Sequence, residues 1–549
     1  MRSVIAADWA FAEIFMDKSE RVLLTGNEAV ARAARDAGVH LGTGYPGTPS
    51  TEILETLAVL GGRAQWAPNE KVAAEVALGV AFGNGMAITT MKHVGLNVAS
   101  DVLYTATHTG ITGALVFVVG DDPGMHSSQN EQDSRRHAVA SGTPVLEPSD
   151  SQECYDFLFE ALHMSHRWGT PVILRMTTRV SHSKSIVQTG PKPLSMGAPF
   201  FKHDRRARVM VPGNARPAHR RMRQKLAEIE AWSEQCALNR ILDGDGELGI
   251  ITSGVAAMHA REAAPDARIL KLGAPYPLPI RKVREFAAGV KRCLVIEEGD
   301  PVLVELCRSG GAMVQGQDEM YRFGELNVNR VRRLIAGDTA PESAAPPGKP
   351  PQLCPGCPHH AVFGILHKHD MVVSGDIGCY TLGVMPPYEA LDSCVCMGAS
   401  IGVGLGLRHV LPEDQARKVV SVIGDSTFVH SGITGLVEMV YNPPKTGHVV
   451  LILDNGTTAM TGLQEHPGTG RTLEHRPTGK VVIEDVARSL GIRNVIVIDA
   501  RKDQADLEQI ILKALAGNEL WVIVARSPCI LAAAHIRQYD KVAEEKCGT

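Results

Sequence analysis

Two polar side chains, Asp425 and Asn455, follow two apolar runs in the last third of the chain. Asp425 comes after 420–423 in Gly-Asp-Ser, and Asn455 comes after 448–453 in Asp-Asn. If both runs are neighbouring strands of a parallel sheet, their ends meet at the edge where ligands bind in open α/β folds. A carboxylate and an amide oxygen suit Mg²⁺, which completes its octahedron with phosphate oxygens and water. Either motif alone is typical of a turn or a helix cap, but the spaced pair predicts a magnesium–diphosphate site, with Gly424 letting the backbone approach the diphosphate.

The spacing of several cysteines indicates a candidate metal or iron–sulfur site. Cys354 and Cys357 form a C-x2-C pair, and Cys379 follows 22 residues later. A fourth cysteine would complete tetrahedral ligation of zinc or an iron–sulfur cluster. The candidates for this fourth ligand are Cys394, Cys396 and Cys529. The first two begin a run of small residues, so we expect them in the core.

Composition limits the class of protein. The chain has 549 residues, 44% hydrophobic, with a net charge of −4, which gives no electrostatic case for nucleic acid. The apolar stretch 4–15 is broken by Asp8 and Glu13 and resembles no signal peptide, and no run is long enough to cross a membrane. We therefore expect a cytoplasmic protein, in which 11 cysteines serve metals, catalysis or packing. The basic run 202–223 is typical of a solvated helix face or linker, or of a site for an anionic partner.

The elements that must position these residues follow an α/β rhythm. The predicted strands are 89–91, 114–119, 172–174, 248–251, 269–272, 293–296, 372–374, 419–423, 449–453 and 522–524, and the predicted helices are 28–37, 70–82 and 222–236. The Pro- and Ala-rich segment 337–352 is the strongest boundary signal. The predicted divisions are 21–190, a linker or helical excursion 191–240, a smaller α/β domain 241–336, the linker 337–352, a domain 353–535 and a tail 536–549.

The sequence GDSTF…LDNGTTAMTG resembles the diphosphate-binding motif of thiamine-diphosphate enzymes, in the version found in 2-oxoacid:ferredoxin oxidoreductases. Ser426 stands where a third glycine is usual. The resemblance implies an α/β, multi-domain fold in which 21–190 binds the pyrimidine, 353–535 binds the diphosphate and 241–336 resembles the transketolase C-terminal domain. It also implies that Asp425 and Asn455 bind Mg²⁺ by side chain and Thr457 by backbone carbonyl. The other cofactor-binding positions it implies are Gly424, Ser426, Met460, His359 and Gly378.

Thiamine diphosphate needs a carboxylic acid against its aminopyrimidine, where it acts as a general acid–base. In the family this acid precedes a small-residue helix and an apolar strand, an order that Glu70 matches within PNEKVAAEVALGVAFGNG. Glu75 is the competing candidate. The alternative for Glu70 is an acid placed at a helix start by the macrodipole.

Three further residues of the first domain match polar motifs. Thr48 lies in GYPGTPS, where it would bind the substrate carbonyl or carboxylate, although the loop also reads as a turn with Ser50 or Thr51 capping a helix. His93 in MKHVGLN would face the substrate. Arg135, or Arg136 as the alternative, lies in a very polar segment after strand 114–120 and would clamp a 2-oxo acid carboxylate. A solvated loop is an equal alternative for each.

Resemblance also assigns the cluster ligands. In the family a late cysteine in a Ser-Pro-Cys-Ile context joins the C-x2-C pair and the Gly-Cys, so Cys354, Cys357, Cys379 and Cys529 would hold one 4Fe–4S cluster. The match runs from 24 to 530 and is closest to the large subunits that oxidise aryl pyruvates such as indolepyruvate and phenylpyruvate. It implies coenzyme A as acyl acceptor and ferredoxin or another protein as electron acceptor. It also implies a smaller beta subunit and a dimer of heterodimers.

One feature departs from the family, whose chains continue into a ferredoxin-like domain. This sequence stops at about the first cysteine of such a domain, Cys547, so we expect either a truncated chain or another protein that carries the electrons away. Two alternatives stay open at this point. A non-oxidative thiamine-dependent decarboxylase would need no cluster, and a scaffold subunit would bind no thiamine diphosphate.

Overall fold

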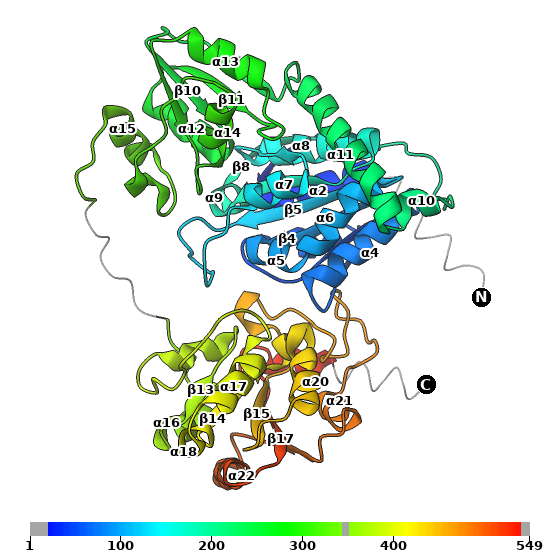
Figure 1. Cartoon of the computed structure of the whole chain (residues 1–549), viewed down its shortest axis with the longest axis vertical. Helices are drawn as coiled ribbons and strands as arrows, with labels where there is room; N and C mark the ends of the chain where they lie inside the picture. Colours follow the sequence, from blue (N-terminus) through cyan, green and yellow to red (C-terminus); the bar gives the residue numbers. More distant parts are fainter. Residues whose placement is uncertain (1–19, 191, 343–350, 540–549) are drawn as a thin grey trace. The chain divides into compact units, whose positions relative to one another are not determined.

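The computed structural model describes residues 20–190, 192–342 and 351–539. The chain divides into two compact units, 1–342 and 343–549 (Figure 1). The expectations for 4–15, for 343–350 of the linker and for Cys547 lie outside the described residues. Across the three described ranges, every helix is too short or too polar to cross a membrane.

The larger sheet of the first unit is parallel, with strand order β3-β2-β4-β5-β7-β6. Its strands are β2 (Leu41–Gly44), β3 (Ala64–Trp66), β4 (Met86–Lys92), β5 (Ala114–Asp121), β6 (Val145–Leu146) and β7 (Val172–Thr177). Every residue of β5 is buried, as expected for a strand covered on both faces. The predicted strands 89–91, 114–119 and 172–174 are the cores of β4, β5 and β7.

Helices cover this sheet and fix the residues at its edge. They are α2 (Gly26–Ala37), α3 (Thr51–Val59), α4 (Glu70–Phe82), α5 (His93–Val98), α6 (Ser100–Thr109), α7 (Ser134–Ser141), α8 (Ser151–Trp168) and α9 (Thr178–His182). A capping box of Thr25 and Glu28 begins α2. Helix α4 begins after the cap Asn69, whose side chain accepts from the Val72 amide.

The rest of the first unit continues the α/β pattern. Strands β1 (Glu20–Thr25) and β8 (Lys184–Thr189) form an antiparallel ribbon, and helices α10 (Arg205–Arg208) and α11 (Pro212–Ser233) follow. The second sheet has the order β12-β10-β11-β9. Its elements are β9 (Asn239–Leu242), β10 (Leu248–Thr252), α12 (Gly254–Ala263), β11 (Arg268–Leu272), α13 (Ile280–Ala288), β12 (Arg292–Ile296), α14 (Val302–Ser309), η1 (Glu319–Arg322) and α15 (Val328–Ala336). The prediction of 222–236 missed the first ten residues of α11, because Pro217 lies inside the helix.

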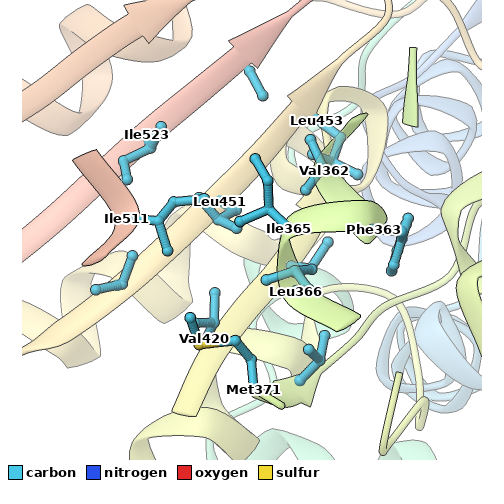
Figure 2. Packing of buried hydrophobic residues seen from close by; sticks show 14 of the residues in the cluster. Val362, Phe363, Ile365, Leu366, Met371, Val420, Leu451, Leu453, Ile511 and Ile523 are labelled. Carbon is cyan, nitrogen blue, oxygen red and sulfur yellow. The ribbon is translucent and has the colours of Figure 1, made fainter. Parts of the chain in front are cut away.

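The second unit is built on a five-stranded parallel sheet, β13-β14-β15-β17-β16. Its elements are α16 (His359–Lys368), β13 (Val372–Ser374), η2 (Cys379–Val384), α17 (Ala399–Val410), α18 (Glu413–Ala416), β14 (Val419–Gly424), α19 (Asp425–Thr427), η3 (Phe428–Gly432), α20 (Ile433–Tyr441), β15 (His448–Asp454), η4 (Ala459–Thr461), α21 (Ile483–Ser489), β16 (Asn494–Ile498), α22 (Gln504–Ala516) and β17 (Leu520–Arg526). Figure 2 shows one face of the sheet, where α16 and α22 pack on β14, β15 and β17. The predicted α/β, multi-domain fold is confirmed.

Candidate functional site

The structure brings the ends of β14 and β15 together, as the sequence predicts. The two strands pair in parallel, with Gly424 opposite Leu453. Asp425 is the first residue of α19 and its side chain is buried. Its carboxylate accepts the backbone N–H of Ser426 at 2.9 Å and that of Gly456 at 2.8 Å. The loop that carries Asn455 is therefore fixed on Asp425 itself.

Charge at this edge is concentrated on Asp425. Burial alone would raise its pKa, but His466, with Nε2 3.3 Å from Oδ2, and the two backbone donors hold the pKa below its usual value. His466 is itself buried. An ionised carboxylate with oriented oxygens is the group that a divalent cation would bind here.

Asn455 and Thr457 lie in the same tight loop. The Asn455 side-chain oxygen accepts the Thr457 N–H at 3.1 Å, and both residues are buried. The Thr457 hydroxyl donates to the Gln464 carbonyl at 3.1 Å. Ser426, which stands where the family usually has a third glycine, accepts a hydrogen bond from the Thr458 hydroxyl at 2.9 Å. This bond connects the start of α19 to the loop that carries Asn455.

Gly424 and Gly378 have a packing role that the sequence did not reveal. A Cβ on Gly424 would lie 2.6 Å from the Tyr380 ring, and one on Gly378 would lie 2.4 Å from the same ring. Tyr380 is buried and donates to the Ile377 carbonyl at 2.9 Å. The two glycines thus admit an aromatic ring beneath the loops that carry Asp425 and Cys379.

The remaining two predicted cofactor residues differ in exposure. His359 begins α16, is buried and lies edge-on to Tyr380. Burial lowers the pKa of His359 to about 4 although Asp425 opposes the shift, so the imidazole is neutral at pH 7. Met460, in η4, is 50% exposed. Its thioether therefore stays available to an apolar or aromatic group.

The four predicted cluster cysteines come from three loops of the second unit. Burial raises the pKa of the Cys379 thiol to about 11, and the nearby thiols of Cys357, Cys529 and Cys354 raise it further. The Cys529 N–H donates to the Asn455 carbonyl at 2.9 Å, which places this loop beside the Asp425 edge. In the described part of the chain, no three His, Cys, Asp or Glu side chains are arranged to hold a metal ion as they stand. The thiols of Cys357, Cys529 and Cys354 are close enough to that of Cys379 to affect its pKa.

Asp376 is a residue that sequence reasoning missed. It is fully buried after β13, and its carboxylate accepts the N–H groups of Ile377, Gly398 and Ser400 at 2.9–3.0 Å. These bonds join the Gly378–Cys379 loop to the start of α17. The signal was the Gly-Asp-Ile-Gly-Cys run itself, a carboxylate directly before a Gly-Cys.

The expectation of core packing holds for one of the two other cysteines. Cys394 is partly buried and packs against the hydrophobic core of the second unit. Cys396 is exposed, so core packing is wrong for it. Its side chain lies in the loop before α17, whose first helical residue is Ala399.

In the first unit, Glu70 begins α4 and is 4% exposed. Its carboxylate lies against the backbone of α5, because a Cβ added to Gly95 would come within 2.6 Å of Oε1. Glu75, the competing acid, is half-exposed and forms an ion pair with Lys71. Of the two candidate acids on α4, Glu70 is therefore the one whose carboxylate is buried.

Lys92 links Glu70 to the polar segment after β5. Its ammonium donates to the Ser127 carbonyl at 2.8 Å. Burial lowers the pKa of Lys92, while the charges of Asp122 and Glu70 oppose that shift. Asp122 in turn accepts the Ser127 N–H at 2.8 Å and the Ser128 hydroxyl at 2.7 Å. This segment is an ordered loop fixed by Asp122, not merely a solvated one.

Thr48 and His93 lie at the same edge of the sheet. Thr48 is half-buried, and its carbonyl lies 3.5 Å from the Ser127 hydroxyl, which donates to it. His93 begins α5 and is 1% exposed, with Nε2 3.1 Å from the Asn130 carbonyl. Its Nδ1 is buried without a partner among the described residues. The predicted helix cap is absent, since neither Ser50 nor Thr51 accepts a hydrogen bond from an α3 amide, Ser50 donating to Gly47 instead.

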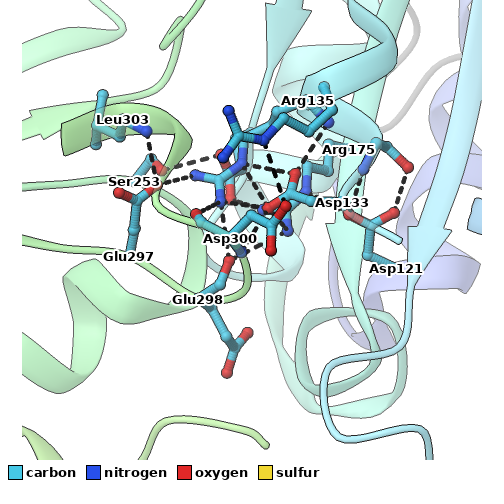
Figure 3. Close-up of polar contacts among 12 residues, drawn as sticks. Asp121, Asp133, Arg135, Arg175, Ser253, Glu297, Glu298, Asp300 and Leu303 are labelled. Atoms are coloured by element: carbon cyan, nitrogen blue, oxygen red, sulfur yellow. Dashed lines mark hydrogen bonds and ion pairs between the residues drawn. The ribbon is translucent and has the colours of Figure 1, made fainter. Parts of the chain in front are cut away.

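Arg135 is placed differently from the prediction. It is 2% exposed, and each of its guanidinium nitrogens donates to protein oxygens, including the carboxylates of Asp133 and Glu297. Figure 3 shows it beside Arg175 between the segments of the two sheets. Arg175 reaches Asp121 at 2.6 Å. These contacts give Arg135 a structural role joining the two sheets in place of the predicted carboxylate clamp.

Comparison with known proteins matches both units. Residues 32–232 match the family described as pyruvate flavodoxin/ferredoxin oxidoreductase, thiamine diphosphate-binding, and 376–525 match the thiamine pyrophosphate enzyme C-terminal binding domain. The chain is 38% identical to indolepyruvate oxidoreductase subunit IorA of Methanothermobacter thermautotrophicus, over 96% of this chain and 90% of that one. It is also 38% identical to IorA of Archaeoglobus fulgidus, over 95% and 89%.

A solved structure shares the fold. It is the 2-oxoglutarate:ferredoxin oxidoreductase of Magnetococcus marinus with 2-oxoglutarate, coenzyme A and succinyl-CoA bound. The TM-score is 0.50 at 18% identity, over 58% of this chain and 65% of that chain. This structural match supports the α/β fold of the chain.

Proposed function

Because this chain belongs to the family of indolepyruvate oxidoreductase IorA subunits, which are thiamine-diphosphate-dependent 2-oxoacid oxidoreductases, we propose that its substrates are aryl 2-oxo acids. Indolepyruvate and phenylpyruvate are the substrates we expect. The products are CO₂ and an aryl-acyl coenzyme A, with two electrons leaving through a 4Fe–4S cluster to ferredoxin or another acceptor. The buried Glu70 carboxylate at the edge of the first sheet is the structural observation that most directly supports a thiamine-dependent reaction, and the aryl substrate rests on the similarity to the IorA subunits.

The second unit offers the groups that would hold Mg²⁺ and the diphosphate. The ionised Asp425 side chain, the Asn455 amide and the Thr457 carbonyl are hard oxygen donors in one tight loop system. The cofactor would be lined by five further residues around these donors: Gly424, Ser426, Gly378, His359 and Met460. In the structure the two glycines already pack on Tyr380, and Ser426 already hydrogen-bonds to Thr458. When bound, thiamine diphosphate supplies the carbanion chemistry that decarboxylation of a 2-oxo acid requires.

In the proposed mechanism Glu70 holds a proton for the aminopyrimidine ring. Its buried position against the α5 backbone favours a hydrogen bond over solvation, and it fixes the direction of the carboxyl group. Lys92 lies within electrostatic range of Glu70, so its ammonium can balance the carboxylate of the incoming substrate. His93, with its unpartnered Nδ1, and Thr48 would orient the 2-oxo group.

The cysteine group would receive the electrons. Cys354, Cys357, Cys379 and Cys529 are of the ligand type that iron–sulfur clusters use, and their thiols lie near one another beside the Asp425 edge. Electrons that leave the cofactor would therefore have a short path within the second unit. We propose that a smaller beta subunit completes the enzyme, in a dimer of heterodimers, and that coenzyme A accepts the acyl group.

The test is a comparison of Glu70→Gln with Glu75→Gln. Both changes remove one negative charge from α4, but Glu75 is exposed and paired with Lys71. Glu70→Gln should lower the rate of substrate-dependent viologen reduction by roughly 10²–10⁴-fold, the usual range for a lost acid–base group. Thiamine diphosphate should still bind by calorimetry. Full activity of Glu70→Gln would refute the assignment.

A further inference from the structure

A cavity lies in the first unit, away from the residues at the Glu70 edge. It has a volume of about 440 Å³ and is bordered by the end of α6, the loop 110–112, Gly169 and the helices α10 and α11. This volume is in the range of small-molecule sites. None of the residues assigned to thiamine diphosphate, substrate or cluster borders it.

The cavity is lined by more positive than negative charge. Its cations are Arg208, Arg221 and Lys225, and its only carboxylate is Asp204, whose Oδ1 already accepts the Ala207 N–H at 3.0 Å. Burial lowers the pKa of Lys225, and the like charges of Arg221 and Arg208 lower it further. The three cations are therefore close enough to repel one another, a cost that a bound anion would relieve.

Two of these cations are held in place by the ends of helices. The Lys225 ammonium donates to the Gly169 carbonyl at 2.9 Å, at the C-terminal end of α8. Arg208 donates to the Gly110 carbonyl at 2.7 Å and to the Thr112 hydroxyl at 2.6 Å. Its guanidinium also stacks on the Phe82 ring, 4.2 Å from the centroid. Positive groups are favourable at helix C-termini, so these contacts alone would explain Lys225 and Arg208.

Two features are left over from that explanation. Arg221 lines the cavity without a hydrogen bond or ion pair to any described residue. The Nε of Arg208 is buried and has no hydrogen-bond partner among the described residues. Hydroxyl groups are also at hand, since Thr107, Thr109 and Thr112 border the same space. A cavity with spare cationic donors and hydroxyls is suited to oxygen-rich anions.

We propose that this cavity binds a small phosphate-bearing anion through Arg221, Arg208 and Lys225. The shared chemistry is a group with two or more phosphate charges, either free diphosphate or the phosphates of a nucleotide. The site is separate from the one that holds the thiamine diphosphate, and its existence does not depend on the proposed reaction.

Calorimetric titration of the enzyme saturated with thiamine diphosphate and excess Mg²⁺ tests the proposal, because the cofactor site is then filled. Inorganic diphosphate is the first probe and ADP the second. We expect one further binding event per chain, weakened at least tenfold, about 1.4 kcal/mol, by Arg221→Glu. Arg220→Glu, next to it on α11 and outside the cavity lining, is the matched control and should bind like the wild type.

The outcomes separate the sources of the anion. Tighter binding of diphosphate than of ADP identifies a free-anion site, and the reverse identifies a nucleotide site. Arg221→Gln, which removes the charge without reversing it, should give a smaller loss than Arg221→Glu. Absence of binding of both probes at millimolar concentration would overturn the proposal, as would equal losses in Arg221→Glu and Arg220→Glu.

Discussion

Replacing Gly95 by alanine tests the position of Glu70 without touching its chemistry. The new Cβ would lie 2.6 Å from Glu70 Oε1, 2.7 Å from Cγ and 2.9 Å from Cδ. Ordinary contacts of a Cβ begin at 3.4 Å, so the carboxylate must retreat by about 0.8 Å. A misplacement of about 1 Å in a catalytic group costs roughly 10²-fold in rate. We therefore expect kcat to fall by about 10²-fold, or about 2.7 kcal/mol of activation free energy.

The control is Gly79→Ala on α4, the helix that carries Glu70. A Cβ at Gly79 meets no atom within 4 Å, so this variant changes helix propensity alone. Both substitutions place alanine in a helix and should not lower the free energy of unfolding through propensity. The assay is viologen reduction with phenylpyruvate and coenzyme A, together with thermal unfolding of both variants. A Gly95→Ala enzyme with kcat within threefold of Gly79→Ala would refute the placement of Glu70.

Three further predictions concern other parts of the chain. Asp425→Asn should weaken magnesium-dependent thiamine diphosphate binding by at least tenfold in calorimetry, because Asp425 is the one charged donor among the three proposed magnesium ligands, and unchanged affinity would contradict that role. Arg135→Met should lower the free energy of unfolding by about 3–5 kcal/mol in urea, because Glu297 would stay buried without its ion-pair partner and Asp133 would keep, of its ion pairs, only the 3.6 Å contact to Arg175. Burial raises the pKa of Glu298 from its ordinary value of 4.5 to about 7. Between these two pH values the Glu298 carboxyl is protonated in the folded protein and ionised in the unfolded chain. Unfolding free energy should therefore fall as pH rises from about 4.5 to about 7, and Glu298→Gln should flatten that slope in urea titrations across pH.

The sheets were predictable because their strands are nearly continuous apolar runs. The pairing of β14 with β15, and with it the meeting of Asp425 and Asn455, followed from the spacing of those runs alone. Glu70 was chosen by resemblance, from its place before a small-residue helix, and the structure adds that it is buried. Local sequence patterns were sufficient to predict a contact where the two residues follow neighbouring strands of one sheet.

Arg135 shows where local patterns fail. Its segment is very polar, which indicated a solvated loop or a substrate contact, yet Glu297 is 162 residues away in the chain and belongs to another sheet. The reason for Gly424 was hidden in the same way, because the ring of Tyr380 comes from a different loop. Helix α11 was shortened in the prediction because the helix tolerates Pro217 near its beginning. The misses at Arg135 and Gly424 arise from long-range contacts, which no single stretch of sequence encodes.

The stoichiometry of the reaction shows whether the enzyme oxidises its 2-oxo acid substrate or only decarboxylates it. Enzyme purified anaerobically with its partner subunit would be given phenylpyruvate, coenzyme A and oxidised viologen, and CO₂, acyl-CoA and reduced dye would be counted together. The account predicts one CO₂, one acyl-CoA and two one-electron reductions of the dye per turnover, by a brown protein that contains iron and sulfide. Release of CO₂ with an aldehyde and no dye reduction would contradict it.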